Sequence, residues 1–160
     1  MDKGKNIKIG GIMQSADLGM VGVMSTPDRP GVASSIMDSL GQHGVNVEFI
    51  VQCIDLNNLS NIVFCVKEAA VDHALALLEE VRKEVGAQRV IVTRDVAIVS
   101  IFGPDFRQRP GIAGAMFKSL ADQGINIMSI STSISTVSCV IESDRLAKAV
   151  QAIRDTFELP

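Results

Sequence analysis

Two proline–glycine turns are the positions in this sequence that could hold a small ligand. Pro30-Gly31 and Pro110-Gly111 each stand at the beginning of an expected helix. The first backbone N–H groups of a helix have no partner within the helix and carry a partial positive charge. Glycine has no side chain to keep a ligand away from them. We therefore expect the amides of residues 31–33 and of residues 111–113 to hold a carboxylate.

An amino-acid ligand also needs acceptors for its ammonium group. Asp28 lies beside the first turn, and Asn46 and Asn126 begin the strands that follow the two helices. Gln52 shares a strand face with Asn46 because side chains alternate along a strand. Pro-Gly is common at helix starts, and Asp28 is also suited to capping the helix. The occurrence of two matched copies favours ligand binding.

No catalytic set of residues accompanies these turns. The sequence has no Ser-His-Asp set, no glycine-rich phosphate loop and no metal-ligand spacing. Cys53, Cys65 and Cys139 are isolated in apolar runs, which predicts three core thiols. We expect no catalytic residue, no metal and no cofactor.

The composition argues against several classes of partner. The chain of 160 residues has a net charge of −3 and no Trp or Tyr, which does not suit nucleic-acid binding. No apolar run is long enough for a membrane span, and the N-terminus lacks the apolar segment of a signal peptide. We expect a cytoplasmic protein without nucleic-acid or membrane partners.

The two turns belong to an internal repeat without gaps. It pairs Pro30 with Pro110, Gly31 with Gly111, Ala33 with Ala113, Leu40 with Leu120, Gly44 with Gly124 and Asn46 with Asn126. A repeat of this length indicates a duplicated small domain rather than a solenoid.

The first copy has the β-α-β-β-α-β order of a ferredoxin-like domain. Its expected strands are residues 18–25, 45–55, 60–67 and 89–93, and its expected helices are residues 30–41 and 69–85. The second copy has expected strands at 96–103, 125–132 and 135–142, and helices at 110–123 and 144–157.

The second copy ends without a fourth strand, whereas residues 6–12 form a spare strand at the N-terminus. We therefore predict an α+β protein of two ferredoxin-like (βαββαβ) domains, in which the N-terminal strand completes the sheet of the second domain. The predicted domains are residues 14–94, and residues 95–160 together with 6–12.

The order strand, Asp-Arg-Pro-Gly, helix, Gly-Val-Asn-Val, repeated in related form, resembles the ACT domain, a small-molecule regulatory module. The sequence is more closely similar to the tandem ACT regulatory region of aspartokinase, in residues 27–33, 44–52, 109–113, 124–133 and 144–159. Aspartokinase phosphorylates aspartate at the head of lysine, threonine and methionine biosynthesis. The resemblance implies allosteric feedback inhibition, by a region of the kinase chain or by a separate small subunit.

The resemblance also implies two effector sites for threonine or lysine, where ACT domains pair across a homodimer. One site would use Asp28, Gly31, Val32, Ala33 and Gln52, facing Asn126 and Ile127. The other would use Gly111, Ile112, Ala113 and Ser131, facing Asn46 and Val47. The implied protein partner is a kinase domain or catalytic subunit. The family's catalytic domain is missing from this sequence, so the chain by itself is not expected to be an enzyme.

Two positions differ from the family pattern. Ile134 stands where a glutamate is usual, and Asn61 stands where an aspartate is usual. Loss of a carboxylate matters more for lysine than for threonine, so these differences favour threonine. An independent ACT-domain amino-acid sensor that regulates another protein is the alternative. A small enzyme on a ferredoxin-like scaffold is the third interpretation, and it is disfavoured because a fold by itself does not supply chemistry.

Overall fold

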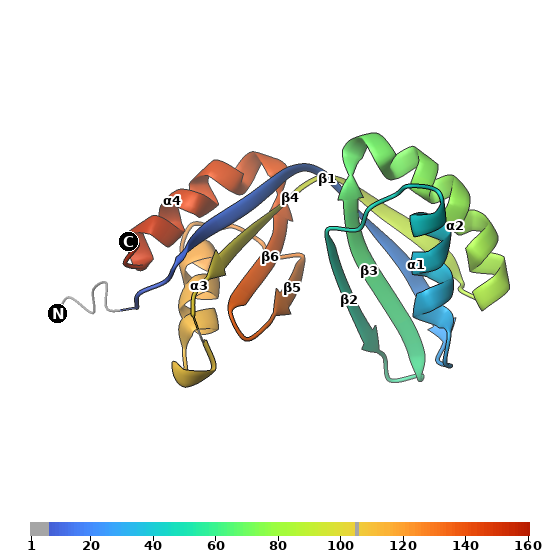
Figure 1. The fold of residues 1–160 in the computed structure, drawn as a ribbon, viewed down its shortest axis with the longest axis horizontal. Helices are drawn as coiled ribbons and strands as arrows, with labels where there is room; N and C mark the ends of the chain where they lie inside the picture. The colour runs from blue at the N-terminus through green and yellow to red at the C-terminus, as the bar shows by residue number, and fades with distance from the viewer. Residues whose placement is uncertain (1–6, 105) are drawn as a thin grey trace. The chain divides into compact units, whose positions relative to one another are not determined.

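The chain divides into two units. The computed structural model describes residues 7–104 and 106–160. The N-terminal unit is Asp17–Asp95, and the C-terminal unit combines the described residues up to Ala16 with Val96–Pro160. Within these residues each unit has four strand segments and two α-helices (Figure 1).

The N-terminal unit has the ferredoxin-like order of strands, β2-β3-β1-β4. Its β1–β3 and β2–β3 pairs are antiparallel, and Val21 and Val23 of β1 lie opposite Phe64 and Ile62 of β3. Its elements are β1 (Gly11–Pro27), α1 (Val32–Gln42), β2 (Phe49–Ile54), β3 (Leu59–Lys67), the 3-10 turn η1 (Glu68–Ala70), α2 (Val71–Val85) and β4 (Arg89–Phe102).

The C-terminal unit repeats this arrangement with strand order β1-β4-β6-β5. Its own elements are η2 (Phe106–Gln108), α3 (Ile112–Ala121), β5 (Ser129–Thr132), β6 (Thr136–Glu142), η3 (Ser143–Arg145) and α4 (Leu146–Thr156). The Gly10 N–H donates to the Phe102 carbonyl at 2.6 Å, and Lys8 forms a parallel bridge with Glu158. The prediction that the N-terminal strand completes the second sheet is therefore confirmed. Within the predicted strand 6–12, residue 6 lies outside the described residues and the regular strand begins only at Gly11.

Strands β1 and β4 are each continuous where the sequence predicted two separate strands. Each contributes one part to each unit. Asp17 and Asp95, where the chain passes between units, have left-handed backbones with φ of 56° and 55°. Aspartate tolerates this conformation better than most residues. A single left-handed residue within a strand thus replaces the predicted breaks.

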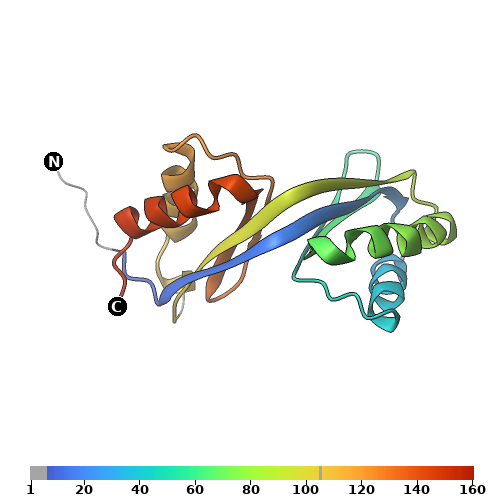
Figure 2. The ribbon, with the colours of Figure 1, turned by 90° about the horizontal axis from the view of Figure 1, so that it is seen from above.

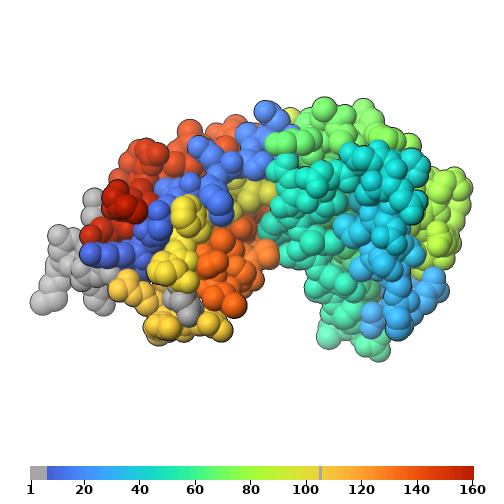
Figure 3. Space-filling view, viewed as in Figure 1, coloured from blue at the N-terminus to red at the C-terminus, as the bar shows by residue number. Residues whose placement is uncertain are grey.

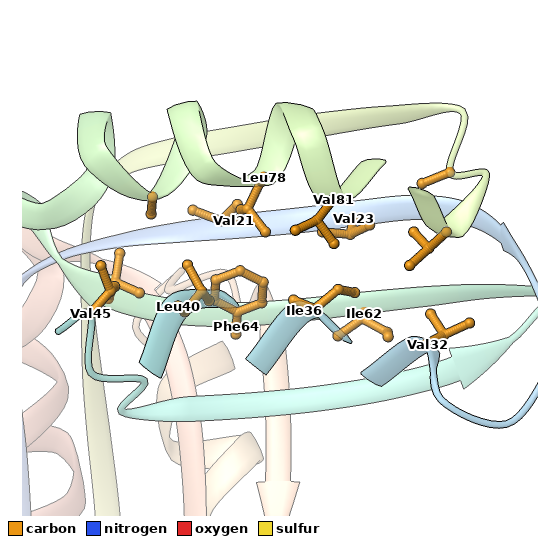
Figure 4. Close-up of a cluster of buried hydrophobic side chains, with 14 of the residues drawn as sticks. Val21, Val23, Val32, Ile36, Leu40, Val45, Ile62, Phe64, Leu78 and Val81 are labelled. Atoms are coloured by element: carbon orange, nitrogen blue, oxygen red, sulfur yellow. The ribbon is translucent and has the colours of Figure 1, made fainter. Parts of the chain in front are cut away.

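Helices α1 and α2 lie side by side over one face of the N-terminal sheet (Figures 1 and 2). The residues that α1 buries, Val32, Ile36 and Leu40, are four apart, as expected for one helix face. They pack with Val21, Val23, Ile62, Phe64, Leu78 and Val81 (Figure 4). Each such side chain stabilises the unit by about 1.5–3 kcal/mol relative to full exposure.

Helices α3 and α4 form the matching layer of the C-terminal unit (Figures 1 and 2). α3 buries Ile112, Met116 and Leu120, at the repeat positions of Val32, Ile36 and Leu40. They pack with Ile9, Val99, Ile101, Val137, Cys139, Ile141, Ala149, Ile153 and Phe157. The two cores are thus built from the same positions of the repeat.

The cysteines differ from one prediction. Cys65 and Cys139 are buried, as expected, but Cys53 is exposed because it lies on the edge strand β2. No helix in the part of the chain that the structure describes is long and apolar enough to cross a bilayer. The described residues also contain no cluster of His, Cys, Asp and Glu that could bind a metal ion.

Candidate functional site

The two helix starts have nearly identical backbones. Gly31 precedes α1 with φ 97° and ψ −11°, and Gly111 precedes α3 with φ 97° and ψ −6°. Residues other than glycine rarely adopt this φ. A Cβ atom added at either glycine would meet nothing within 4 Å, so the space beside each turn is open. In the space-filling view the turn before α1, in light blue, lies at the surface (Figure 3).

No side chain caps either helix in the described structure. The alternative role of Asp28, capping of α1, is therefore not seen, because the helix begins at Val32 and Asp28 stays exposed outside it. The Gly31 carbonyl accepts hydrogen bonds from the Ser35 amide at 3.0 Å and the Ser34 hydroxyl at 2.9 Å. The first amides of α1 thus have no side-chain cap, and the space beside the turn is open.

The basic residue of the first turn points toward the neighbouring helix. The Arg29 guanidinium donates to the Glu84 carbonyl, in the last turn of α2, at 3.2 Å. A cation at the C-terminal end of a helix is favourable because the last carbonyls carry partial negative charge. This bond ties the turn before α1 to α2 and leaves Asp28 as the exposed charge beside Gly31.

Gln52 lies near the start of α1. It is opposite Ile62 on the β2–β3 pair and therefore shares the sheet face that the helices cover. Ile62 packs in the same cluster as Val32, the first residue of α1 (Figure 4). The Gln52 Nε2 donates to the Ser60 Oγ at 2.7 Å. The predicted residues Asp28, Gly31, Val32, Ala33 and Gln52 thus belong to one end of this unit.

Two other predicted residues lie at the opposite end of α1. Asn46 is exposed and Val47 is half-buried, and both follow the C-terminus of this helix of 11 residues. That length is roughly 16 Å. Asn126 and Ile127 occupy the same positions after α3. Neither pair is near the glycine turn of its own unit.

The start of α3 borders a hollow of about 240 Å³ within the C-terminal unit. Gly111, Ile112 and Ala113 were predicted to belong to this site. The other lining residues were not predicted from the sequence, and they are Phe106, Arg107, Arg109, Pro110, Thr132, Ser133 and Val137. Helix amides, two arginines and two hydroxyl-bearing side chains suit a carboxylate.

Ser131 does not line this hollow. It lies opposite Ser138, whose hydroxyl pairs with the Ser100 hydroxyl at 2.6 Å. Because Val99 and Ile101 face the helices, Ser100 and its strand neighbours face the other side of the sheet. Thr132, one residue later, stands at the repeat position of Gln52. The alternation of strand side chains therefore turns Thr132, rather than Ser131, toward the hollow.

Asn61 and Ile134, the two residues that differ from the family pattern, each accept a hydrogen bond from a backbone amide. The Asn61 Oδ1 accepts from the Ser25 amide at 2.9 Å, at the bulge of β1. The Ile134 carbonyl accepts from the Phe106 amide at 2.8 Å, while its side chain is 52% exposed. Ile134 therefore helps to hold the loop that precedes α3 and borders the hollow.

Comparisons with known proteins agree with the geometry. Residues 20–86 and residues 99–157 each match the ACT domain family. The regulatory subunit of aspartate kinase from Thermus thermophilus, in its ligand-free form, is 31% identical with a TM-score of 0.84, over 94% of this chain and 99% of that one. The chain belongs to the aspartokinase regulatory family.

Other relatives place the tandem ACT region within larger proteins or assemblies. The aspartate kinase of Pseudomonas fluorescens (strain SBW25) is 38% identical over 151 residues, which cover 94% of this chain but 37% of that kinase. A chain in a crystal structure of aspartokinase alpha and beta subunits is 29% identical in sequence, with a TM-score of 0.81, over 91% of this chain and 95% of that chain. The described residues of this ACT region are therefore those of a regulatory part and include no kinase domain.

Proposed function

We propose that this ACT region binds threonine or lysine and thereby mediates feedback inhibition of an aspartate kinase. The observation that carries the proposal is the pair of uncapped helix starts with matching backbones at Gly31 and Gly111. The ligand's carboxylate would bind the amides of residues 31–33 in one unit and of residues 111–113 in the other.

The remaining groups of the ligand would bind polar side chains. In the N-terminal unit, Asp28 is suited to the ammonium group and the Gln52 amide to a polar side chain. In the C-terminal unit, Thr132 takes the place that the sequence first suggested for Ser131. A second copy of the chain would contribute Asn126 and Ile127 to the first site, and Asn46 and Val47 to the second.

The neutral partners around Gln52 favour threonine over lysine. The Gln52 amide is bonded to the Ser60 hydroxyl. The Asn61 side chain faces the other side of the sheet, opposite Cys53, so it is not one of the groups around Gln52. A hydroxyl ligand can exchange hydrogen bonds with these neutral groups without placing an unpaired ammonium among them.

Dimerisation through the ACT domains is part of the proposal. Strands β2 and β5 are the first and last in the order of strands, and each has one edge without a strand partner among the described residues. Ile50 and Ile54 of β2 are 43% and 46% exposed, and Ile130 of β5 is 42% exposed. Apolar edge strands favour pairing with another copy. Size-exclusion chromatography with light scattering would give the mass of a dimer.

The regulated partner is a kinase domain or catalytic subunit of aspartokinase, in the cytoplasm. The similarity to a subunit crystallised with its aspartokinase partner supports this assignment. A ligand shifts an equilibrium between active and inhibited states only through its different affinities for the two. The effector would therefore bind more tightly when the kinase is in the inhibited state.

Thermal denaturation in the presence of each of the twenty amino acids tests the proposal. Threonine or lysine at a hundred times its Kd should stabilise the chain by roughly 2.7 kcal/mol. Gln52→Ala should weaken that stabilisation. Gln42→Ala should leave it unchanged, because Gln42 is exposed at the other end of α1. Stabilisation by neither threonine nor lysine would refute the effector assignment, and a response to a different amino acid would identify an independent sensor.

A further inference from the structure

The Thr26 hydroxyl is buried near the start of α1 without a hydrogen-bond partner. The residue is 0% exposed, and its Oγ1 bonds to no atom in the described part of the chain. Buried hydroxyls in folded proteins nearly always have a partner, because loss of hydration otherwise destabilises the fold. The groups next to the Thr26 Oγ1 therefore indicate which partner it could bond in another state of the protein.

A bulge in β1 sets the direction of Thr26. The register of β1 against β3 shifts between Val23 and Thr26, and Ser25 within the bulge has φ 54°. After the shift Thr26 lies opposite Ser60, on the sheet face that also carries Ile62. Without the bulge Ser25 would stand opposite Ser60. The bulge thus turns the Thr26 hydroxyl toward the covered face, five residues before Gly31.

Ser60 connects Thr26 to the edge of the sheet. Ser60 is 0% exposed, and its Oγ accepts the hydrogen bond from the Gln52 Nε2 at 2.7 Å. As an acceptor from Gln52, the Ser60 hydroxyl keeps its own proton to donate. Its partner across the strands is Thr26. Two buried hydroxyls and one carboxamide therefore form a row from the interior to the exposed edge strand.

This row determines which end of the Gln52 amide a ligand meets. With Nε2 bonded to Ser60, the Oε1 atom is the one available to accept a hydrogen bond from outside. Such an acceptor selects a donor on the ligand, either an ammonium group or a hydroxyl. A ligand with an acceptor opposite the Gln52 Oε1 would leave both that oxygen and its own acceptor atom without a hydrogen bond to each other.

We propose that Thr26 is a positioning residue of the effector site in the N-terminal unit. Through Ser60 it holds Gln52 with Oε1 toward the ammonium or hydroxyl of the bound amino acid. The Thr26–Ser60 hydrogen bond forms when the ligand fixes Gln52. The chain keeps a buried hydroxyl that destabilises the ligand-free state because the bound state uses it. This inference rests on the proposed function.

Thr26→Val and Thr26→Ser separate this role from a structural one. Valine keeps the shape of threonine and removes the hydroxyl, whereas serine keeps the hydroxyl. Isothermal titration of the full chain with threonine, and separately with lysine, should show that Thr26→Val weakens the ligand that binds by roughly 3- to 10-fold. Thr26→Ser should bind within about twofold of the wild type. The melting temperature of ligand-free Thr26→Val should equal or exceed that of the wild type.

Ser60→Ala supplies a second, independent variant. If the hydroxyls act in one row, the double variant with Thr26→Val should bind no more weakly than Ser60→Ala alone. Wild-type affinity in Thr26→Val, or additive losses in the double variant, would overturn the role of Thr26 and leave the proposed function intact. A wild-type chain that binds neither amino acid would overturn both.

Discussion

Gly31 and Gly111 are conserved between the two copies for a backbone reason that also leaves room for a ligand. Their φ of 97° is accessible to glycine at little energetic cost, and the added Cβ would contact nothing within 4 Å. The requirement for glycine is therefore conformational rather than steric. Ligand binding and helix initiation depend on the same residue.

Replacement of Gly31 by alanine tests this conformational requirement. Gly31→Ala should lower the free energy of unfolding by about 1–2 kcal/mol, the cost of a left-handed backbone with a Cβ. Gly41→Ala is the matched control, since Gly41 lies within α1 and also has open space around it. It should raise stability by about 0.5–1 kcal/mol. Urea denaturation measures both, and equal effects would contradict the conformational explanation.

The buried thiols predict a loss of stability at alkaline pH. Burial raises the pKa of Cys65 and of Cys139 from 9.0 to about 12, and the charge of Glu48 adds to the effect at Cys65. Below pH 9.0 both states keep the proton. Between 9.0 and about 12 the unfolded chain loses it first, so the free energy of unfolding falls as pH rises.

The expected slope is up to ~1.4 kcal/mol per pH unit for each thiol. Urea denaturation across this pH range should show a shallower fall for Cys65→Ala than for the wild type. Cys53→Ala is the control, because Cys53 is exposed. An unchanged slope in Cys65→Ala would mean that this thiol ionises equally in both states.

At the scale of elements, the bulge in β1 determines which sheet face the residues before α1 occupy. The Asn61 side chain on β3 holds the bulge through the Ser25 amide. Asn61→Ala should destabilise the N-terminal unit by about 1 kcal/mol, because the amide loses its acceptor in a partly buried position. Asn61→Asp keeps an acceptor oxygen and should cost less. Thermal unfolding checks the order, and equal losses would show that the bond contributes little.

Repeat and periodicity were sufficient to predict the elements and the spare N-terminal strand. The four-residue spacing of Val32, Ile36 and Leu40 predicted the buried face of α1. The continuity of β1 and β4 was not predictable in this way. Aspartate at 17 and 95 suggests a turn in the sequence, but strand pairing on both sides keeps the chain extended around one left-handed residue.

The candidate site was predictable where it depends on the turns and less so where it depends on strand faces. Both glycines follow from the repeat. The resemblance suggested Ser131, whereas the alternation of side chains in β5 turns Thr132 toward the hollow. Arg107 and Arg109 were missed because their approach to α3 depends on how the loop folds back, which no local pattern encodes.

At the scale of the whole molecule, the two units differ in how they obtain their fourth strand. The N-terminal unit contains all four of its strand segments within Asp17–Asp95. The C-terminal unit takes its fourth strand from the beginning of the chain. Ile9 from that segment is 4% exposed within the C-terminal core. The C-terminal unit therefore cannot be completed by Val96–Pro160 alone.

Fragments of the chain test this difference in completeness. Residues 17–95 should fold alone with a cooperative thermal transition, because no strand of their sheet is missing. Residues 96–160 alone should show little protection of amide hydrogens, since β4 loses its neighbour β1 and the core loses Ile9. A peptide of residues 7–16 added in trans should restore protection, because the Gly10–Phe102 and Ile9–Glu158 backbone bonds join the two pieces.

A variant peptide with Ile9→Asp is the control and should fail, since it would bury an unpaired carboxylate. Cooperative folding of residues 96–160 without the peptide would mean that three strands and two helices suffice, and that the N-terminal strand is an accessory to the sheet.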